Sequence, residues 1–174
     1  MRFKNILLTD TVSIPQIGFG TYKLSEGGEA EAAVGSALEA GYRHIDTASM
    51  YGNEKSIGKA VRTSGIERKE IFITTKVWNS EQGRYETKKA LEDSLTRLNM
   101  DYVDLYLIHW PVDGKYLETW EEMIALHEDG LARAIGVSNF HEHHLNDILE
   151  KGLKKPVINQ VELHPYLQQK QLRQ

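Results

Sequence analysis

The fold is decided by Gly41-Tyr42-Arg43-His44-Ile45-Asp46-Thr47-Ala48-Ser49-Met50-Tyr51-Gly52-Asn53-Glu54. The first part, 42–45, predicts a short buried strand with Asp46 at its end. A turn of small residues then carries Tyr51, and Glu54 opens the next predicted helix. A carboxylate and a phenol on one strand-to-helix connection can take part in proton transfer. Taken alone, this stretch is better interpreted as a solvated loop, but polar side chains recur at the ends of other predicted strands.

Strands and helices alternate on both sides of this stretch. Apolar residues recur at strand or helix spacing in each segment, and glycines end several of the helices. The predicted elements in chain order are a hairpin of 3–8 and 11–14, strand 17–20, helix 29–40, strand 42–45, helix 53–63, strand 70–76, helix 85–98, strand 102–108, helix 115–129, strand 134–137, helix 141–151, strand 156–161 and a helix that begins at Leu167.

This alternation has the period of βαβ units, about 30 residues, which build parallel sheets. A doubly wound dinucleotide fold requires a glycine fingerprint after its first strand, and residues 18–23 lack the third glycine of that pattern. A (β/α)₈ TIM barrel needs no fingerprint and carries its chemistry at the carboxyl ends of its strands. We therefore expect an α/β fold of the barrel type. Residues 1–174 form one incomplete domain with about six βα units, and strands seven and eight are missing.

Length and composition fit one globular domain. The 174 residues are 40% hydrophobic and 26% charged, and the net charge of −4 gives no reason to expect a nucleic-acid partner. The lack of cysteine excludes a disulfide framework, a thiolate metal site and a cysteine nucleophile. No apolar run is long enough for a signal-peptide core or a membrane span, so we expect a cytoplasmic protein without a membrane partner.

Polar or aromatic side chains follow every strand of the predicted barrel. Because the carboxyl ends of barrel strands meet at one rim, these side chains are expected to converge. A lone polar residue after a strand is usually a turn former, but a converging aspartate, tyrosine, lysine and histidine indicate a functional site. The full set comprises Thr21, Tyr22, Lys23, Asp46, Lys76, Trp78, His109, Trp110, Ser138, Asn139, Gln160, Glu162 and His164.

Four of these residues suggest acid catalysis. A free tyrosine has a pKa of about 10 and is a weak acid at neutral pH. A lysine ammonium nearby favours the phenolate, so we expect Lys76 to lower the pKa of Tyr51 and Asp46 to hold Lys76 in place. His109 can orient a carbonyl oxygen by hydrogen bonding, which makes Tyr51 a general acid for that oxygen.

Four longer motifs resemble the aldo-keto reductases. They are residues 41–58, Ile-His-Trp-Pro at 108–111, Ile-Gly-Val-Ser-Asn-Phe at 135–140, and Asn-Gln-Val-Glu-Leu-His-Pro-Tyr at 159–166. The resemblance covers essentially the whole chain. It is greatest to the bacterial branch that reduces small aldehydes and ketones, such as diketogluconate or glyoxal-type substrates.

This resemblance implies an oxidoreductase with a barrel fold that uses NADPH to reduce a small carbonyl substrate. It assigns the role of proton donor to Tyr51. The resemblance also implies that Asp46, Lys76 and His109 complete the catalytic tetrad. It implies cofactor contacts from Gly20, Thr21 and Asp46, and hydrogen bonds to the nicotinamide carboxamide from Ser138, Asn139 and Gln160. The implied substrate pocket is lined by Tyr22, Trp78, His109 and Trp110.

The chain is shorter than a complete barrel of this family. A complete barrel of this type has roughly 250 residues, and in the family the later part binds the adenosine 2′-phosphate. We expect the full-length form to be a monomer, whereas unpaired strand edges favour self-association of the shorter chain. A truncated product or a fragment is the interpretation we favour over half of a split or swapped pair.

Other functions fit the sequence less well. A catalytically silent barrel that acts as a binding or regulatory protein is the main alternative, and the missing cofactor lobe favours it. A Schiff-base enzyme would need Lys76 without a carboxylate partner. His141 and His144 would share one face of a helix, but a third metal ligand at suitable spacing is not evident, so we expect solvated histidines at a helix start and no metal. His44 is expected to be a core residue.

Overall fold

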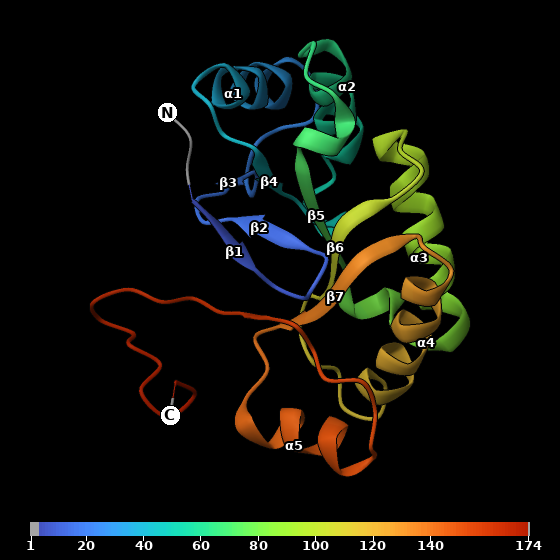
Figure 1. The fold of residues 1–174 in the computed structure, drawn as a ribbon. Helices are drawn as coiled ribbons and strands as arrows, with labels where there is room; N and C mark the ends of the chain where they lie inside the picture. Colours follow the sequence, from blue (N-terminus) through green and yellow to red (C-terminus); the bar gives the residue numbers. More distant parts are fainter. Residues whose placement is uncertain (1–3, 174) are drawn as a thin grey trace.

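A sheet of six parallel strands forms the centre of the computed structural model, which describes residues 4–173. The strands lie side by side in the order in which the chain visits them, as a barrel wall requires (Figure 1). They are β3 (Phe19–Gly20), β4 (His44–Asp46), β5 (Phe72–Val77), β6 (Val103–Ile108), β7 (Ala132–Ser138) and β8 (Asn159–Gln160).

One helix follows each of the first five strands of this sheet, and the helices lie around its outer side (Figure 1). This arrangement confirms the predicted (β/α)₈ barrel in its incomplete form, with most helix bounds within one or two residues of expectation. The helices are α1 (Gly28–Glu39), α2 (Glu54–Thr63), α3 (Arg84–Leu98), α4 (Tyr116–Glu128) and α5 (Glu142–Glu150). Among residues 4–173, no helix combines the length and apolar character that a membrane span requires.

The middle of the sheet is buried on both faces. Every residue of β5 and β6 is buried. Side chains alternate along a strand, so Tyr106 and Ile108 join the core under the helices, whereas Leu105 and Leu107 join a second core on the inner side. The carboxyl ends of these strands are therefore held by packing from two directions.

A hairpin covers the inner side of the sheet. Strands β1 (Asn5–Leu7) and β2 (Ser13–Pro15) pair antiparallel. Val12 and Ile14 pack in the second core with Phe72, the first residue of β5. The hairpin prediction is thus confirmed from residue 4 onward, whereas its first residue, Phe3, lies outside the described residues.

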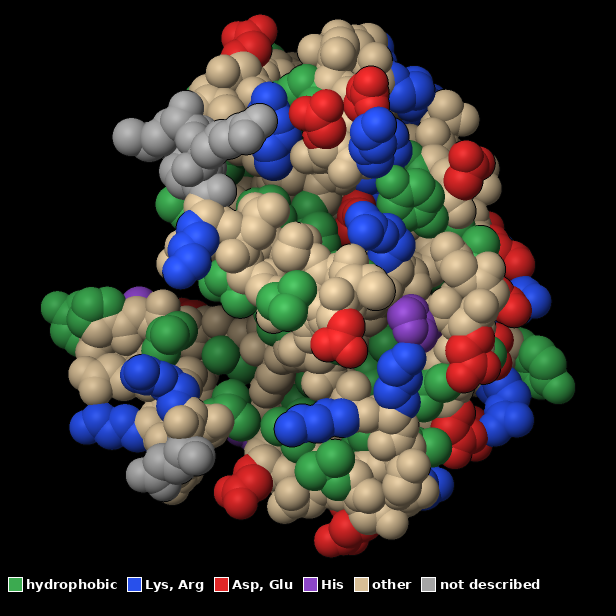
Figure 2. Space-filling view, in the orientation of Figure 1, with side chains coloured by type: hydrophobic (Ala, Val, Ile, Leu, Met, Phe, Trp, Pro, Cys, Tyr) green, Lys and Arg blue, Asp and Glu red, His purple; other side chains and the backbone are tan. Residues whose placement is uncertain are grey.

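The helix predicted from Leu167 onward is wrong. Residues 161–173 run as turns and bends, with one isolated bridge between His164 and Leu167. Nearly all of these residues are exposed, and a short helix in water is marginal unless an apolar face packs against a neighbour. In the space-filling view this segment stands away from the rest of the molecule and carries hydrophobic side chains on its surface (Figure 2).

Two strands of the described sheet are paired on one side only. β3 pairs with β4, β8 pairs with β7, and both edge strands are two residues long. The expected open edges are therefore present in residues 4–173. The predicted strand 156–161 is paired only at Asn159–Gln160.

Candidate active site

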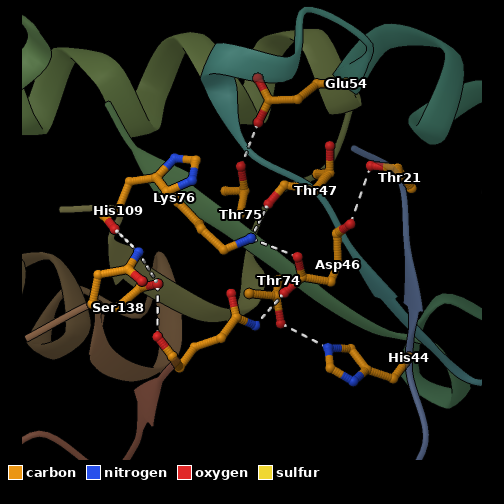
Figure 3. A network of polar contacts seen from close by, with 12 residues as sticks. Thr21, His44, Asp46, Thr47, Glu54, Thr74, Thr75, Lys76, His109 and Ser138 are labelled. Atoms are coloured by element: carbon orange, nitrogen blue, oxygen red, sulfur yellow. Dashed lines mark hydrogen bonds and ion pairs between the residues drawn. The ribbon is translucent and has the colours of Figure 1, made fainter. Parts of the chain in front are cut away.

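A buried ion pair lies at the carboxyl ends of β4 and β5. The Nζ atom of Lys76 donates to Oδ1 of Asp46 at 2.5 Å and to the carbonyl oxygen of Thr47 at 2.9 Å (Figure 3). The Lys76 side chain is 0% exposed and that of Asp46 is 15% exposed. The expectation that Asp46 holds Lys76 is confirmed, and two oxygen acceptors offset the cost of burying the ammonium.

Tyr51 and His109 lie next to this ion pair. Tyr51 belongs to a short 3₁₀ helix, Ser49–Tyr51, directly after β4, and His109 follows β6. The ring centroids of Tyr51 and His109 are 5.6 Å apart, and Nζ of Lys76 lies 5.3 Å from the Tyr51 ring centroid. The structure thus brings together all four residues that the sequence placed in one cluster.

The environment keeps the proton on Tyr51. Burial, then the charge of Asp46 and the neighbouring Tyr22, raise the pKa of Tyr51 to about 12. The expectation that Lys76 lowers this pKa is therefore wrong for the chain described here. The physical reason is that the charge of Lys76 is matched by Asp46 at 2.5 Å, while burial disfavours the phenolate.

His109 is neutral in this environment. Burial and the charge of Lys76 lower the pKa of His109 to about 4, although Asp46 opposes the shift. Its Nδ1 atom is buried without a hydrogen-bond partner. Burial also lowers the pKa of Lys76, and the ion pair with Asp46 opposes that change. The cluster therefore combines a protonated phenol with an uncharged imidazole.

The ends of β7 and β8 lie next to the cluster and carry Ser138, Asn139 and Gln160. The Ser138 hydroxyl donates to the Gln160 carbonyl at 2.9 Å, and Nδ2 of Asn139 donates to the His109 carbonyl at 3.0 Å. The Gln160 side chain reaches across the sheet, where its Nε2 atom donates to Oδ2 of Asp46 at 2.8 Å. This contact joins the last described strand to the ion pair.

The loop after β3 supplies the remaining predicted cofactor contacts. Thr21 is fully buried, and both its backbone amide and its hydroxyl donate to the Asp46 carbonyl, at 3.0 and 3.1 Å. Gly20 has open space where a side chain would begin. The ring of Tyr22 is 58% exposed and packs against Tyr51 with a centroid separation of 5.0 Å.

A pocket of about 390 Å³ opens beside Tyr51 and His109. Trp110 lines it directly, and Trp78 packs edge-on against the His109 ring at 5.0 Å. Larger grooves lie elsewhere, beside α5 and 167–172, away from these side chains. The sequence did not single out Met50 or Val161, because apolar residues in loops carry no distinctive pattern. The full lining is Tyr22, Met50, Tyr51, His109, Trp110, Ser138, Asn139, Gln160, Val161 and Glu162.

Two histidines outside this cluster, His44 and His144, are buried. His44 is buried, and its Nε2 lies 3.0 Å from the Thr74 hydroxyl, as expected of a core residue. His141 and His143 are exposed, but the expectation of a solvated residue is wrong for His144. Its ring packs against Tyr116 and Phe140 because α5 turns that face toward α4. Within residues 4–173, no group of three or more His, Asp or Glu side chains is arranged to hold a metal ion.

Comparison with known proteins matches the chain to one protein family and to reductases. Residues 16–174 match the model of the Aldo/keto reductase family. The glyoxal reductase of Bacillus subtilis (strain 168) is 50% identical over 168 residues, which make up 97% of this chain and 61% of that protein. The 9,11-endoperoxide prostaglandin H2 reductase of Trypanosoma cruzi is 48% identical over 99% of this chain and 61% of its own length. The chain thus spans 61% of the length of these relatives.

Solved structures agree in fold. An aldo/keto reductase from Brucella melitensis superimposes with a TM-score of 0.93 at 52% identity, covering 98% of this chain and 67% of that one. The aldo-keto reductase of Bombyx mori, solved in complex with NADP, superimposes with a TM-score of 0.86 at 38% identity, covering 94% of this chain and 59% of that one.

Proposed function

The chain belongs to the aldo/keto reductase family, and from this premise we propose that it carries the catalytic residues of a reductase of small aldehydes and ketones that uses NADPH. The observation that carries the proposal is the Asp46–Lys76 ion pair, 2.5 Å long, with Tyr51 and His109 beside it at the rim of the sheet. The names of its relatives support the substrate class, since one is a glyoxal reductase and another a methylglyoxal reductase.

The side chains present fit a nicotinamide. A carboxamide needs both donors and acceptors, and Ser138, Asn139 and Gln160 offer a hydroxyl and two amides next to the pocket. Gly20, with open space in place of a side chain, leaves room for close approach, and Thr21 and Asp46 adjoin it. When bound, NADPH supplies the hydride that the carbonyl carbon accepts. The NADP complex of the Bombyx mori relative favours NADPH over NADH.

Tyr51 supplies the proton in this proposal. Its phenol carries a proton at neutral pH, and that proton passes to the carbonyl oxygen as the carbon gains the hydride, which gives an alcohol. Neutral His109 lines the same pocket and orients the oxygen by a hydrogen bond. Nζ of Lys76 lies 5.3 Å from the Tyr51 ring centroid, and in this proposal it offsets the part of the charge left on Tyr51 that its own pairing with Asp46 allows.

Aromatic side chains form part of the pocket wall. Trp110 and Tyr22 present aromatic surface around the reacting groups, and Trp78 supports His109 from behind. Aromatic walls exclude water and favour a small carbonyl substrate. We expect the reaction to take place in the cytoplasm, where NADPH is available, and we expect the full-length form to be a monomer.

The first test compares two polypeptides. One is the 174-residue chain, and the other is the same chain extended with the part of the Bacillus subtilis glyoxal reductase that it does not match. We expect the extended chain to bind NADPH in a fluorescence titration and to oxidise it when glyoxal is added. Lack of NADPH binding by both polypeptides, each shown to be folded, would contradict the cofactor assignment.

The second test addresses the proton donor. In the extended chain, Tyr51→Phe removes the phenol, and we expect turnover to fall by about 10²- to 10⁴-fold, the usual contribution of a general acid. NADPH binding should be retained, because the ring remains. Leu163→Ala, at an exposed residue that is not among those lining the pocket, serves as the control. Equal turnover in Tyr51→Phe and the parent chain would exclude Tyr51 as the donor.

A further inference from the structure

Asn53 is a fully buried asparagine directly before α2, two residues after Tyr51. Asparagine in this position normally caps the helix, because its side-chain oxygen accepts a hydrogen bond from a free backbone amide. Here the side chain makes no such bond, although the Asn53 carbonyl accepts from the Ile57 amide at 3.1 Å. The amide group of Asn53 is therefore directed to another part of the molecule.

That amide joins two loops at the rim of the sheet. Nδ2 of Asn53 donates to the carbonyl of Thr21 at 2.9 Å and to the carbonyl of Leu24 at 3.0 Å. Oδ1 of Asn53 accepts from the Thr47 hydroxyl at 3.0 Å. The two N–H donors and the oxygen are all used, each at good hydrogen-bond length. One buried side chain thus connects the loop after β3 to the loop after β4.

Both loops touch the catalytic ion pair. The Thr47 carbonyl accepts from Nζ of Lys76 at 2.9 Å, and the Thr21 hydroxyl donates to the Asp46 carbonyl at 3.1 Å (Figure 3). The backbone amide of Thr21 donates to the same carbonyl at 3.0 Å. The residue after Thr21 is Tyr22, whose ring packs against Tyr51. A displacement of either loop therefore changes the surroundings of Lys76 and of the phenol together.

We propose that Asn53 is a positioning residue, which locks the loops after β3 and β4 together so that Thr47 holds the Lys76 ammonium beside Tyr51. The expected effect of Asn53 on turnover rests on the proposed function. Its expected effect on the position of Lys76 does not, because it follows from the hydrogen bonds of this chain. Aspartate has no N–H donors, and it would place a negative charge next to the carbonyl oxygens of Thr21 and Leu24. Alanine would leave the buried Thr47 hydroxyl without its acceptor and would take one hydrogen bond from each of the Thr21 and Leu24 carbonyls. Losing a partner of a buried polar group is costly in a protein interior.

The test uses three variants and one matched control. Asn53→Ala removes the whole amide, Asn53→Asp removes only its donors, and Thr47→Val removes the hydroxyl bonded to Oδ1 while keeping the side-chain shape. The control is Ser56→Ala. Its hydroxyl, also buried on α2, accepts from the Gly27 amide at 2.7 Å, so it ties α2 to the same loop region without reaching Thr21, Thr47 or Lys76.

The first readout needs no catalysis. The pKa of Lys76 is measured in the 174-residue chain by NMR of ¹³C-labelled lysine, with Lys76→Met identifying the signal. Loss of the Thr47 acceptor disfavours the ammonium, so we expect the pKa of Lys76 to fall in Asn53→Ala and Thr47→Val and to stay at the parent value in Ser56→Ala. If Asn53→Ala does not fold, Thr47→Val decides alone. An unchanged Lys76 pKa in the folded variants would overturn the proposal.

The second readout is turnover in the extended chain. Misplacement of a reacting group by about 1 Å can cost on the order of 10²-fold in rate, so we expect Asn53→Ala and Asn53→Asp to lower kcat on that scale with little change in KM. Ser56→Ala should match the parent. Variants with a shifted Lys76 pKa but parental kcat would overturn the positioning role. If the parent extended chain is inactive, the proposed function fails, while the Lys76 measurement still tests Asn53.

Discussion

The two sides of the active site are held in different ways. On the side of β4 to β6, Lys76 is fully buried, and His109 is 7% exposed between the packed ends of two strands. On the side of β8, Gln160 is half-buried, and residues 162–168 are exposed. The side of β4 to β6, here called the packed side, therefore depends on packing within the described chain, whereas the side of β8 rests on a short edge strand.

A side-chain hydrogen bond between Gln160 and Asp46 joins the two sides. Gln160 reaches Asp46 through one hydrogen bond of 2.8 Å, whereas Lys76 holds Asp46 with an ion pair and is itself anchored by Thr47. A side chain held by one hydrogen bond at a half-buried site can be redirected to a ligand at small cost. We expect Gln160 to exchange Asp46 for a nicotinamide, while the ion pair stays in place.

The largest expected loss of stability comes from removing the carboxylate of the ion pair on the packed side. Asp46→Asn leaves the Lys76 ammonium buried without a carboxylate, and we expect the free energy of unfolding at pH 7 to fall by about 3–5 kcal/mol. Gln160→Ala, on the other side, should cost less than about 1 kcal/mol. Urea unfolding of both variants measures the difference. Equal midpoints for the two variants would contradict the contrast between the two sides.

The next largest effect is a dependence of folding stability on pH, which arises from His109 on the packed side. The pKa of His109 is lowered to about 4 in the folded chain, against about 6.5 in the unfolded chain. The unfolded chain therefore binds a proton first, so stability is complete above pH 6.5 and falls as the pH drops toward 4. The loss attributable to His109 is up to about 3 kcal/mol.

This dependence is checked by urea unfolding between pH 4 and 7 for the parent chain and His109→Gln. The variant should show a smaller loss, with a remainder from His44, whose pKa burial also lowers. Identical pH profiles for the two proteins would mean that His109 is not held neutral in the folded chain.

The smallest effect is expected in the exposed segment after β8. Leu163 and Leu167 are 55% and 41% exposed, so Leu163→Ser and Leu167→Ser should change the free energy of unfolding by no more than about 0.5 kcal/mol. Leu107→Ala, at a fully buried position of β6, is the matched control and should cost about 2–5 kcal/mol. A loss above 1 kcal/mol in the exposed variants would show that this segment packs in solution.

Much of the fold could be predicted because apolar spacing reports burial directly. The buried run in β6 and the helical spacing of Leu91, Leu95 and Leu98 led to the correct elements. The helix expected from Leu167 failed for the same reason: the pattern assumes a neighbour that covers the apolar face, and residues 161–173 have little cover. Local spacing does not reveal whether that neighbour is present.

The candidate site was predictable in composition but not in electrostatics. Asp46, Lys76 and His109 lie at the carboxyl ends of three consecutive strands, so the barrel topology alone brings them together. The protonation of Tyr51 depends on burial and on the distances to Asp46 and Tyr22, which the order of residues does not contain. Asn53 escaped notice because an asparagine before a helix is usually a cap.

The sequence by itself determined the alternation of strands and helices, the barrel type, and the residues that meet at its rim. These follow from side-chain periodicity and from the rule that parallel strands end on one side. Only the tertiary structure decided the charge states of Tyr51 and His109 and the role of the Asn53 amide. Those properties depend on desolvation and on hydrogen bonds between loops far apart in the chain, and both arise only when the strands are packed together.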